Sequence, residues 1–115
     1  MTPRVLIVDD SQPMRKMLRM MLAGAAEVVG ECEDGSGALD AYSREQPDWV
    51  LMDVDMKGVD GITATQQIIA VYPRARIMMV TDHDDRELRR AAIEAGAQQY
   101  VVKEDLMSIL EILKT

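Results

Sequence analysis

The sequence is poor in cysteine and contains no long hydrophobic run. Its single cysteine, Cys32, can form neither a disulfide within the chain nor a zinc site built from several thiolates, which suits a reducing compartment. The apolar run at residues 5–8 is followed by two aspartates and is too short for a signal-peptide core or for a membrane span of about 20 residues. We therefore expect a cytoplasmic chain without a membrane partner.

Positive charge is also scarce. The chain has 13 lysines and arginines against 20 aspartates and glutamates, a formal net charge of −7. This sign opposes the phosphate backbone of nucleic acids, so we expect no direct nucleic-acid binding by this chain. The length of 115 residues and an apolar content of 48% predict one domain, residues 1–115, with a core that needs no disulfide or structural metal.

Short apolar runs alternate with helical patterns along the whole chain. Strands are expected at residues 5–8, 28–29, 50–52, 77–80 and 100–102. Apolar spacing predicts helices around residues 14–22, 38–42, 62–72, 88–95 and 106–113, with Ser11 as the first N-cap and Gly96 closing the fourth helix. This alternation predicts an α/β fold with a single doubly wound parallel sheet of five strands and five helices.

Polar residues follow the apolar strands at the point where each strand ends. Asp9 and Asp10 follow the first strand, Asp53 the third, Thr81 the fourth and Lys103 the fifth. The carboxyl ends of parallel strands share one edge of the sheet, so these side chains should converge there. Three clustered carboxylates repel one another, and Mg²⁺ relieves that repulsion, while a lysine and a hydroxyl suit phosphoryl oxygens. The spacing thus predicts a Mg²⁺-dependent phosphate site.

Each of these residues also has a structural explanation when it is taken alone. Asp9 and Asp10 precede a helix start, where acidic residues are common, Thr81 can simply end a strand, and Lys103 can be a solvated charge. Asp53 is harder to explain in this way, because aspartate is unfavourable beside a buried strand. The functional interpretation is favoured because the acidic pair, Asp53, Thr81 and Lys103 all stand at the carboxyl ends of predicted strands.

Taken together, these motifs resemble the response-regulator receiver domain of two-component signalling over essentially the whole chain. Residues 5–10 resemble its acidic pair, and residues 51–56 with Asp60-Gly61 resemble its phosphoacceptor strand and the following loop. Val80-Thr81 resembles the switch hydroxyl, and residues 100–103 resemble the aromatic residue and lysine of the last strand. The resemblance implies the flavodoxin-like receiver fold, with strand order 2-1-3-4-5.

The resemblance also implies a chemistry for the acidic residues. Asp53 would accept a phosphoryl group from the phosphohistidine of a sensor histidine kinase. Mg²⁺, or Mn²⁺ in its place, would be held directly by Asp10 and Asp53, by the backbone carbonyl of Asp55, and by Asp9 through water. Such a chain is not an enzyme with a separate substrate, since it catalyses only its own phosphotransfer and dephosphorylation.

Further implied roles concern the switch and its partners. Lys103 would pair with the phosphoryl group, Thr81 would move to hydrogen-bond it, and Tyr100 would swing inward into the vacated space. The change would reach the face formed by the fourth helix, fifth strand and fifth helix. That face would control a C-terminal output domain outside this chain, a separate partner, or a phosphorylation-dependent homodimer.

Three residues depart from the family pattern. Lys57 stands where proline is usual, which predicts a less rigid loop with Gly58 supplying the turn. Asp82 stands where a small residue is usual and adds negative charge near the entering phosphoryl group, so we expect slow phosphotransfer or altered dephosphorylation. Glu104 replaces a proline that often has a cis bond, and we expect a trans bond here. The Lys103-Glu104 pair after the last strand resembles the receivers of LuxR/NarL-type transcription regulators.

Other marked residues and other classes of protein carry less weight. His83 is expected to be a solvated loop residue, and the arginines at positions 86, 89 and 90 are expected to form an exposed helix face.

A haloacid-dehalogenase-type phosphatase is one alternative function. It would use Asp53-Val54-Asp55, but the chain is short for such an enzyme, and Asp9-Asp10 would have no explanation. The other alternative is a pseudo-receiver that works without phosphorylation. The chain argues against it because it keeps the complete set of Asp9, Asp10, Asp53, Thr81 and Lys103. A flavodoxin-like cofactor binder would need a phosphate loop rich in Ser, Thr and Gly after the first strand, and this chain has none there.

Overall fold

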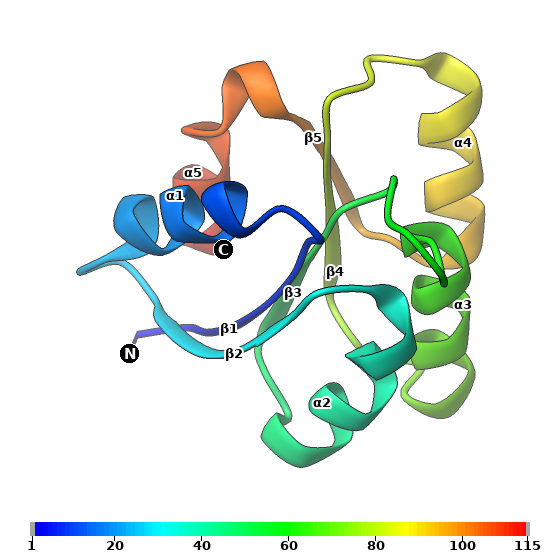
Figure 1. The fold of residues 1–115 in the computed structure, drawn as a ribbon, viewed down its shortest axis with the longest axis horizontal. Helices are drawn as coiled ribbons and strands as arrows, with labels where there is room; N and C mark the ends of the chain where they lie inside the picture. Colours follow the sequence, from blue (N-terminus) through cyan, green and yellow to red (C-terminus); the bar gives the residue numbers. More distant parts are fainter. Residues whose placement is uncertain (1, 115) are drawn as a thin grey trace.

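The predicted strands form one parallel sheet with helices on both of its faces (Figure 1). The computed structural model describes residues 2–114 of the chain. The strand order is β2-β1-β3-β4-β5, which confirms the expected order. The chain adds β2 on one side of β1 and the later strands on the other, so the order reverses between β1 and β3. The elements are β1 (Arg4–Val8), α1 (Gln12–Leu22), β2 (Glu27–Cys32), the 3-10 turn η1 (Gly35–Gly37), α2 (Ala38–Glu45), β3 (Trp49–Met52), α3 (Gly61–Val71), β4 (Ile77–Thr81), α4 (Arg86–Ala95), β5 (Gln99–Val102), the 3-10 turn η2 (Lys103–Asp105) and α5 (Ser108–Leu113).

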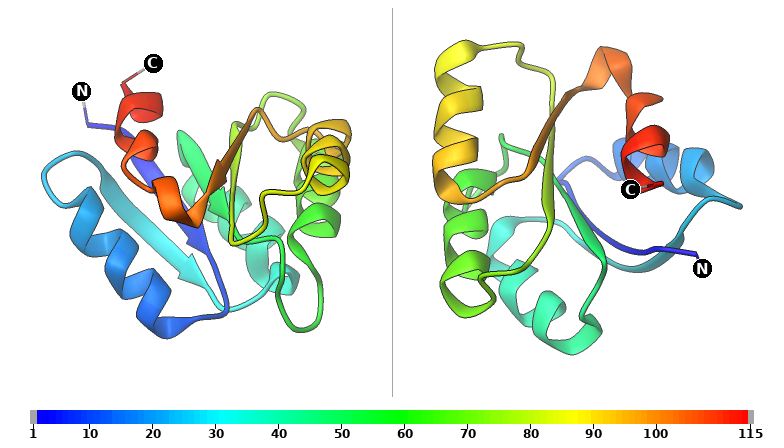
Figure 2. Two further views of the ribbon diagram at one scale, coloured as in Figure 1. Left: turned by 90° about the horizontal axis from the view of Figure 1, so that it is seen from above. Right: turned by 180° about the vertical axis from the view of Figure 1, so that it is seen from behind.

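Each face of the sheet has its own hydrophobic core. Helices α1 and α5 cover one face, and α2, α3 and α4 cover the other (Figure 2). Successive residues of β1 alternate between the two cores: Leu6 and Val8 pack toward α2, α3 and α4, whereas Val5 and Ile7 pack toward α1 and α5. All four side chains are fully buried. Burial on both faces explains why the central strands are continuous apolar runs rather than alternating ones.

Side-chain caps determine where three helices begin. Ser11 at α1 and Asp60 at α3 each accept a hydrogen bond from the N–H three residues later, at 3.2 and 2.8 Å. Asp85 accepts from the N–H groups of the first turn of α4. Gly96 ends α4 with φ of +116°, a left-handed conformation that glycine adopts without strain. No helix within residues 2–114 is long and apolar enough to cross a membrane.

Most element boundaries differ from the sequence prediction by one to three residues, and two of these differences have a clear physical reason. Strand β2 runs over Glu27–Cys32 instead of residues 28–29, because this edge strand is only partly buried and lacks a continuous apolar run. The last helix begins at Ser108 instead of residue 106, since residues 106–107 form a turn between the 3-10 turn at residues 103–105 and the helix. Apolar spacing does not separate such a turn from the first turn of an α-helix. No peptide bond among the described residues is cis, as expected for Glu104.

The only tryptophan of the sequence lies far from the polar edge of the sheet. Trp49 begins β3 and is buried, and the guanidinium carbon of Arg76 lies 4.2 Å from the centroid of its ring. Asp53 follows the opposite end of the same strand. Trp49 therefore reports on unfolding of the core rather than on events at the strand ends.

Candidate functional site

The structure brings the predicted polar residues to one edge of the sheet. The amide of Asp53 donates to the carbonyl of Val8 at 2.8 Å, so the pairing of β1 with β3 continues one residue beyond the strands. This pairing places the chain after β3 beside the chain after β1. The residues that stand at the four strand ends are Asp9, Asp10, Asp53, Thr81 and Lys103.

Three carboxylates form a cluster at this edge. Asp9, Asp10 and Asp53 each offer one carboxylate oxygen, and these oxygens lie within 4.8 Å of one another. Asp9 and Asp53 are only 2% and 6% exposed, whereas Asp10 is exposed and gives access from solvent. Clustered hard oxygen donors with an open side fit a small divalent cation such as Mg²⁺. The donor set is therefore suited to the ion that the sequence predicts.

Lys103 supplies positive charge to the same cluster. Its ammonium nitrogen lies 3.3 Å from Oδ2 of Asp9 and 3.6 Å from Oδ1 of Asp53. Burial acts to lower the pKa of Lys103, but the attraction of Asp53, Asp9 and Asp82 outweighs it and raises the pKa. The lysine is thus fixed as a cation beside the acidic cluster.

Asp53 differs from an ordinary surface aspartate in its proton affinity. Burial, followed by repulsion from Asp9, raises the pKa of Asp53 to about 6, although Lys103 acts to lower it. Asp10 and Asp55 add smaller repulsions. The carboxylate is therefore destabilised as it stands and gains from any group that brings positive charge to it.

Asp9 has a partner on each of its carboxylate oxygens, a hydrogen bond on one and an ion pair on the other. Oδ1 accepts from the N–H of Ser11 at 2.9 Å, and Oδ2 faces Lys103. The backbone carbonyl of Asp9 also accepts from the guanidinium of Arg15 at 2.7 Å. These contacts orient the Asp9 side chain and occupy its lone pairs in part, in contrast to the exposed carboxylate of Asp10.

Thr81 and Tyr100 meet at the backbone of His83. Thr81 is fully buried, and its hydroxyl accepts a hydrogen bond from the N–H of His83 at 3.2 Å. The hydroxyl of Tyr100 donates to the carbonyl of His83 at 2.6 Å. Tyr100 is 9% exposed and belongs to the core under α2, α3 and α4, so its ring occupies the inward position in this structure.

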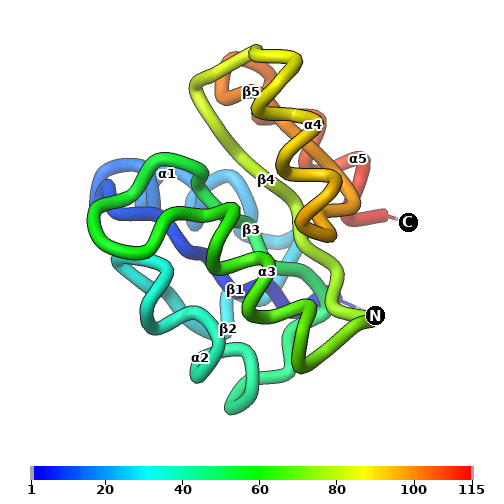
Figure 3. Tube along the Cα trace, turned by 90° about the vertical axis from the view of Figure 1, so that its right-hand side faces the viewer, coloured from blue at the N-terminus to red at the C-terminus, as the bar shows by residue number. Residues whose placement is uncertain are grey.

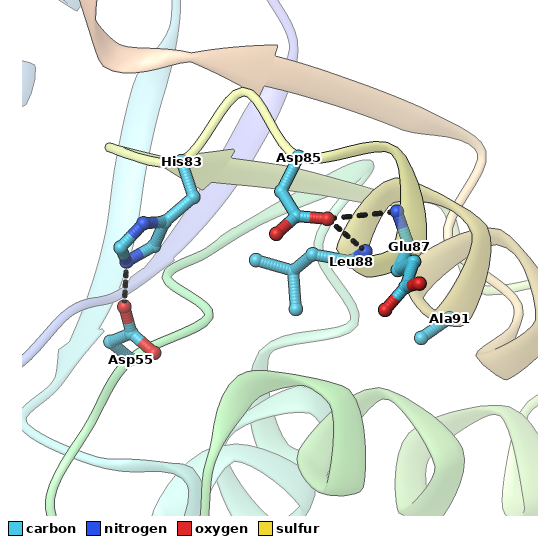
Figure 4. A pocket seen from close by; sticks show the side chains of 6 residues that line it. All are labelled: Asp55, His83, Asp85, Glu87, Leu88 and Ala91. Atoms are coloured by element: carbon cyan, nitrogen blue, oxygen red, sulfur yellow. Dashed lines mark hydrogen bonds and ion pairs between the residues drawn. The ribbon is translucent and has the colours of Figure 1, made fainter.

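His83 has more contacts than the sequence predicted. Its side chain is about half exposed, as a solvated loop residue would be, but its imidazole pairs with the carboxylate of Asp55 (Figure 4). Asp55 lies in the loop after β3 and His83 in the loop after β4, so the pair connects two loops across the site edge. The open pocket beside this pair is lined by Asp55, His83, Asp85, Glu87, Leu88 and Ala91. Nothing in the local sequence indicated this contact, because it depends on how the two loops meet.

The loop behind Asp53 depends on a glycine whose steric role the sequence did not reveal. A Cβ atom at Gly61 would lie 1.9 Å from the backbone oxygen of Asp53, and the Gly61 amide donates to Val54 at 3.0 Å. Only glycine allows so close an approach. Gly58, with φ of +76°, forms the turn that was predicted to follow Lys57.

One arginine of α4 is not merely part of an exposed helix face. The guanidinium carbon of Arg89 lies 4.5 Å from the centroid of the Tyr100 ring. The exposed-face prediction fits Arg90, which pairs with Glu94 on its own helix. The contact of Arg89 with β5 is a tertiary one, and sequence spacing carries no signal for it.

Fold and site together define a signalling class: a doubly wound sheet with three carboxylates, a hydroxyl and a lysine at its carboxyl edge. Residues 5–114 match the family model of the response regulator receiver domain. The chain is 39% identical to chemotaxis protein CheY of Bacillus subtilis over 104 residues, which cover 90% of this chain and 87% of CheY. The chain therefore belongs to the response-regulator receiver family.

Two further relatives show the range of this similarity. Transcriptional regulatory protein DegU of Brevibacillus brevis is 33% identical over 114 residues, which cover 96% of this chain and 48% of DegU. The crystal structure of a LuxR-family two-component response regulator from Aurantimonas sp. SI85-9A1 superposes with a TM-score of 0.91 at 34% identity, covering 99% of this chain and 86% of that one. The chain thus spans most of CheY but about half of DegU.

Proposed function

We propose that this chain is a Mg²⁺-dependent phosphoacceptor domain of two-component signalling, spanning residues 1–115 and working in the cytoplasm. Asp53 is the acceptor, and a sensor histidine kinase is the donor. The observation that carries the proposal is the position of Asp53, which is buried, clustered with two other carboxylates within 4.8 Å, and 3.6 Å from Lys103.

Asp53 acts as the nucleophile in this proposal. A carboxylate oxygen of Asp53 attacks the phosphorus of the phosphohistidine, the bond from phosphorus to the imidazole nitrogen breaks, and the imidazole leaves. The pKa of Asp53, raised to about 6 by burial first of all, leaves the group mainly ionised at pH 7 and more basic than a surface aspartate. This state is suited to forming an acyl phosphate.

Two residues stabilise the transferred phosphoryl group. Lys103 pairs with its oxygens, since the ammonium is already 3.6 Å from Asp53. The Thr81 hydroxyl accepts from His83 and so keeps its own hydrogen to donate to a phosphoryl oxygen. A small rotation of Thr81 makes that bond.

The divalent cation is held by a subset of the cluster. Asp10 and Asp53 would hold it directly, with the backbone carbonyl of Asp55 as the ligand that the family resemblance adds, whereas Asp9 would contribute through water because both of its oxygens already have partners. Mg²⁺ is the expected ion and Mn²⁺ a substitute. When bound, the ion neutralises carboxylate charge and orients phosphoryl oxygens.

The output of the domain lies on the face formed by α4, β5 and α5. Tyr100 of β5 contacts the backbone next to Thr81 through His83, so a change at the phosphorylated site reaches this face within two residues. A C-terminal output domain, a separate protein or a second copy of the chain reads the face. The chain accepts a phosphoryl group and loses it by hydrolysis, without turning over a separate substrate.

Intact-mass measurement tests the assignment of Asp53. The purified protein is incubated with acetyl phosphate and Mg²⁺, and the wild type is compared with Asp53→Asn and with Asp40→Asn, which changes an exposed aspartate of α2. We expect one phosphoryl group on the wild type and on Asp40→Asn, and none on Asp53→Asn. An adduct that persists in Asp53→Asn contradicts the assignment. A wild type that is unmodified by both acetyl phosphate and phosphorylated kinases is a phosphorylation-independent module.

A further inference from the structure

The ring of Tyr100 is covered from outside by an arginine of the neighbouring helix. The guanidinium carbon of Arg89 lies 4.5 Å from the ring centroid, within the range in which a cation is attracted to an aromatic face. The Arg89 side chain is itself 47% exposed, while Tyr100 is 9% exposed. Arg89 therefore covers the ring on the side of α4, the helix that runs beside β5 in Figure 3.

Two further contacts fix this arrangement. The Tyr100 hydroxyl donates to the carbonyl of His83 at 2.6 Å, and Nη2 of Arg89 lies 3.8 Å from Oδ1 of Asp84. His83 and Asp84 are neighbours in the loop between β4 and α4. Strand, loop and helix thus all contact either the ring or the arginine that covers it.

The groups that hold the ring inward belong to α4, to the loop before it and to the hydrophobic core. We propose that Arg89 is a positioning residue that holds Tyr100 inward before any phosphoryl group reaches Asp53. The inference rests on the proposed function only in taking Tyr100 as part of the response to phosphorylation. The inward position of the ring is a property of the unmodified chain. Phosphorylation then acts on a face whose aromatic residue is already in place.

The charge around the phenol ring supports this role. Burial is the main cause that raises the pKa of Tyr100. Arg89 acts to lower this pKa, and the carboxylates of Asp85, Asp84 and Asp55 add to the rise. Arg89 is therefore the cation that offsets an acidic environment on this side of the ring. Without it, Tyr100 faces carboxylates and solvent.

Helix α4 also provides a matched control. Arg90 stands next to Arg89, carries the same charge, and pairs with Glu94 at 3.2 Å instead of with the ring. Arg89→Gln and Arg90→Gln make the same chemical change at adjacent exposed positions. Only the first removes the cation over Tyr100.

Nuclear magnetic resonance of ring-¹³C-tyrosine protein measures the position of the ring. The chain has three tyrosines, and the Tyr100 signals are assigned with Tyr100→Phe. Spectra are recorded for the wild type, Arg89→Gln, Arg90→Gln and Arg89→Lys, each alone and with Mg²⁺ and beryllofluoride. We expect ring contacts to the Arg89 side chain in the unmodified wild type, and little change of the Tyr100 shift on adding beryllofluoride.

In Arg89→Gln alone we expect the Tyr100 shift to move, with the ratio of inward to outward ring falling about two- to fivefold. Beryllofluoride should reverse this movement, Arg90→Gln should match the wild type, and Arg89→Lys should lie between. A Tyr100 shift in unmodified Arg89→Gln that equals that of the wild type and of Arg90→Gln overturns the inference. The unmodified spectra decide it even if acetyl phosphate fails to modify Asp53, so the two proposals fail separately.

Discussion

The ammonium nitrogen of Lys103 lies 3.3 Å from Oδ2 of Asp9, and this pair stands inside the acidic cluster. Asp9 is almost completely buried, and Lys103 is largely so. A lysine in this position compensates part of the charge that the three carboxylates accumulate. Lys103 does not reach the exposed side of the cluster at Asp10, which stays open to a divalent cation.

Loss of Lys103 should therefore lower the stability of the fold. Lys103→Met keeps the length of the side chain but leaves Asp9 and Asp53 without their cation, so we expect the free energy of unfolding at pH 7 without Mg²⁺ to fall by about 2–4 kcal/mol. Urea unfolding followed by Trp49 fluorescence measures the loss. Lys114→Met, which changes an exposed lysine paired with Glu111, is the control. Equal losses in the two variants would contradict a special role for Lys103.

The stability of the protein should depend on pH through Asp53. The folded-state pKa of Asp53 is raised from 3.8 to about 6, so the stability associated with its protonated form is fully present below pH 3.8 and is lost as the pH rises through 6. Without divalent cation, we expect Asp53→Asn to exceed the wild type at neutral pH by up to about 3 kcal/mol. Urea unfolding at a series of pH values in EDTA measures this. Parallel pH profiles for the two proteins would exclude the effect.

Binding of Mg²⁺ should stabilise the fold through Asp10. Because Asp10 is exposed, Asp10→Asn should change the stability without cation by no more than about 0.5 kcal/mol. The wild-type melting temperature should rise with Mg²⁺ concentration, and most of this rise should disappear in the variant. Thermal unfolding followed by Trp49 fluorescence across a Mg²⁺ titration makes the comparison. The same dependence in both proteins would place the ion elsewhere.

Gly61 should tolerate no side chain. Its Cβ would lie 1.9 Å from the backbone oxygen of Asp53, so Gly61→Ala must displace α3 or the loop after β3, at a cost of about 2–4 kcal/mol. Gly37→Ala is the matched control, because its Cβ would meet nothing within 4 Å and its φ is −93°. Chemical denaturation measures both changes. A Gly61→Ala protein as stable as Gly37→Ala would show that the loop yields freely.

Removing the extra carboxylate at position 82 should speed phosphorylation. Asp82 is exposed but close enough to raise the pKa of Lys103, so its charge reaches the region where, in the proposed function, an anionic phosphoryl donor enters. We expect Asp82→Ala to react with acetyl phosphate about two- to fivefold faster at low ionic strength, with a smaller difference at high salt. Time-resolved intact mass gives the rates. Rates that match the wild type at every salt concentration rule out the effect.

The sheet and the positions of the site residues could be predicted from the sequence because they depend on local patterns. A strand buried on both faces is a continuous apolar run, and the aspartate that interrupts it marks both the end of the strand and the edge of the sheet. Asp9, Asp10 and Asp53 were predicted to meet for this reason, and their oxygens lie within 4.8 Å of one another.

Contacts between loops and helices could not be predicted in the same way. His83 pairs with Asp55 and Arg89 covers Tyr100 because separate loops and elements meet in space, and no short-range pattern encodes that meeting. The 3-10 turn at residues 103–105 was also missed, since its three residues are all charged and carry no apolar pattern.

The arrangement of the two cores has a consequence for how such a protein can diversify. The side chains that fill the cores point to the faces of the sheet, whereas the chemistry stands on the loops that leave its carboxyl edge. Exposed loop positions such as Lys57, Asp82 and Glu104 can thus be exchanged without repacking either layer. In the proposed function, the rate of phosphorylation and the choice of partner can therefore be adjusted at these positions while the fold keeps its stability.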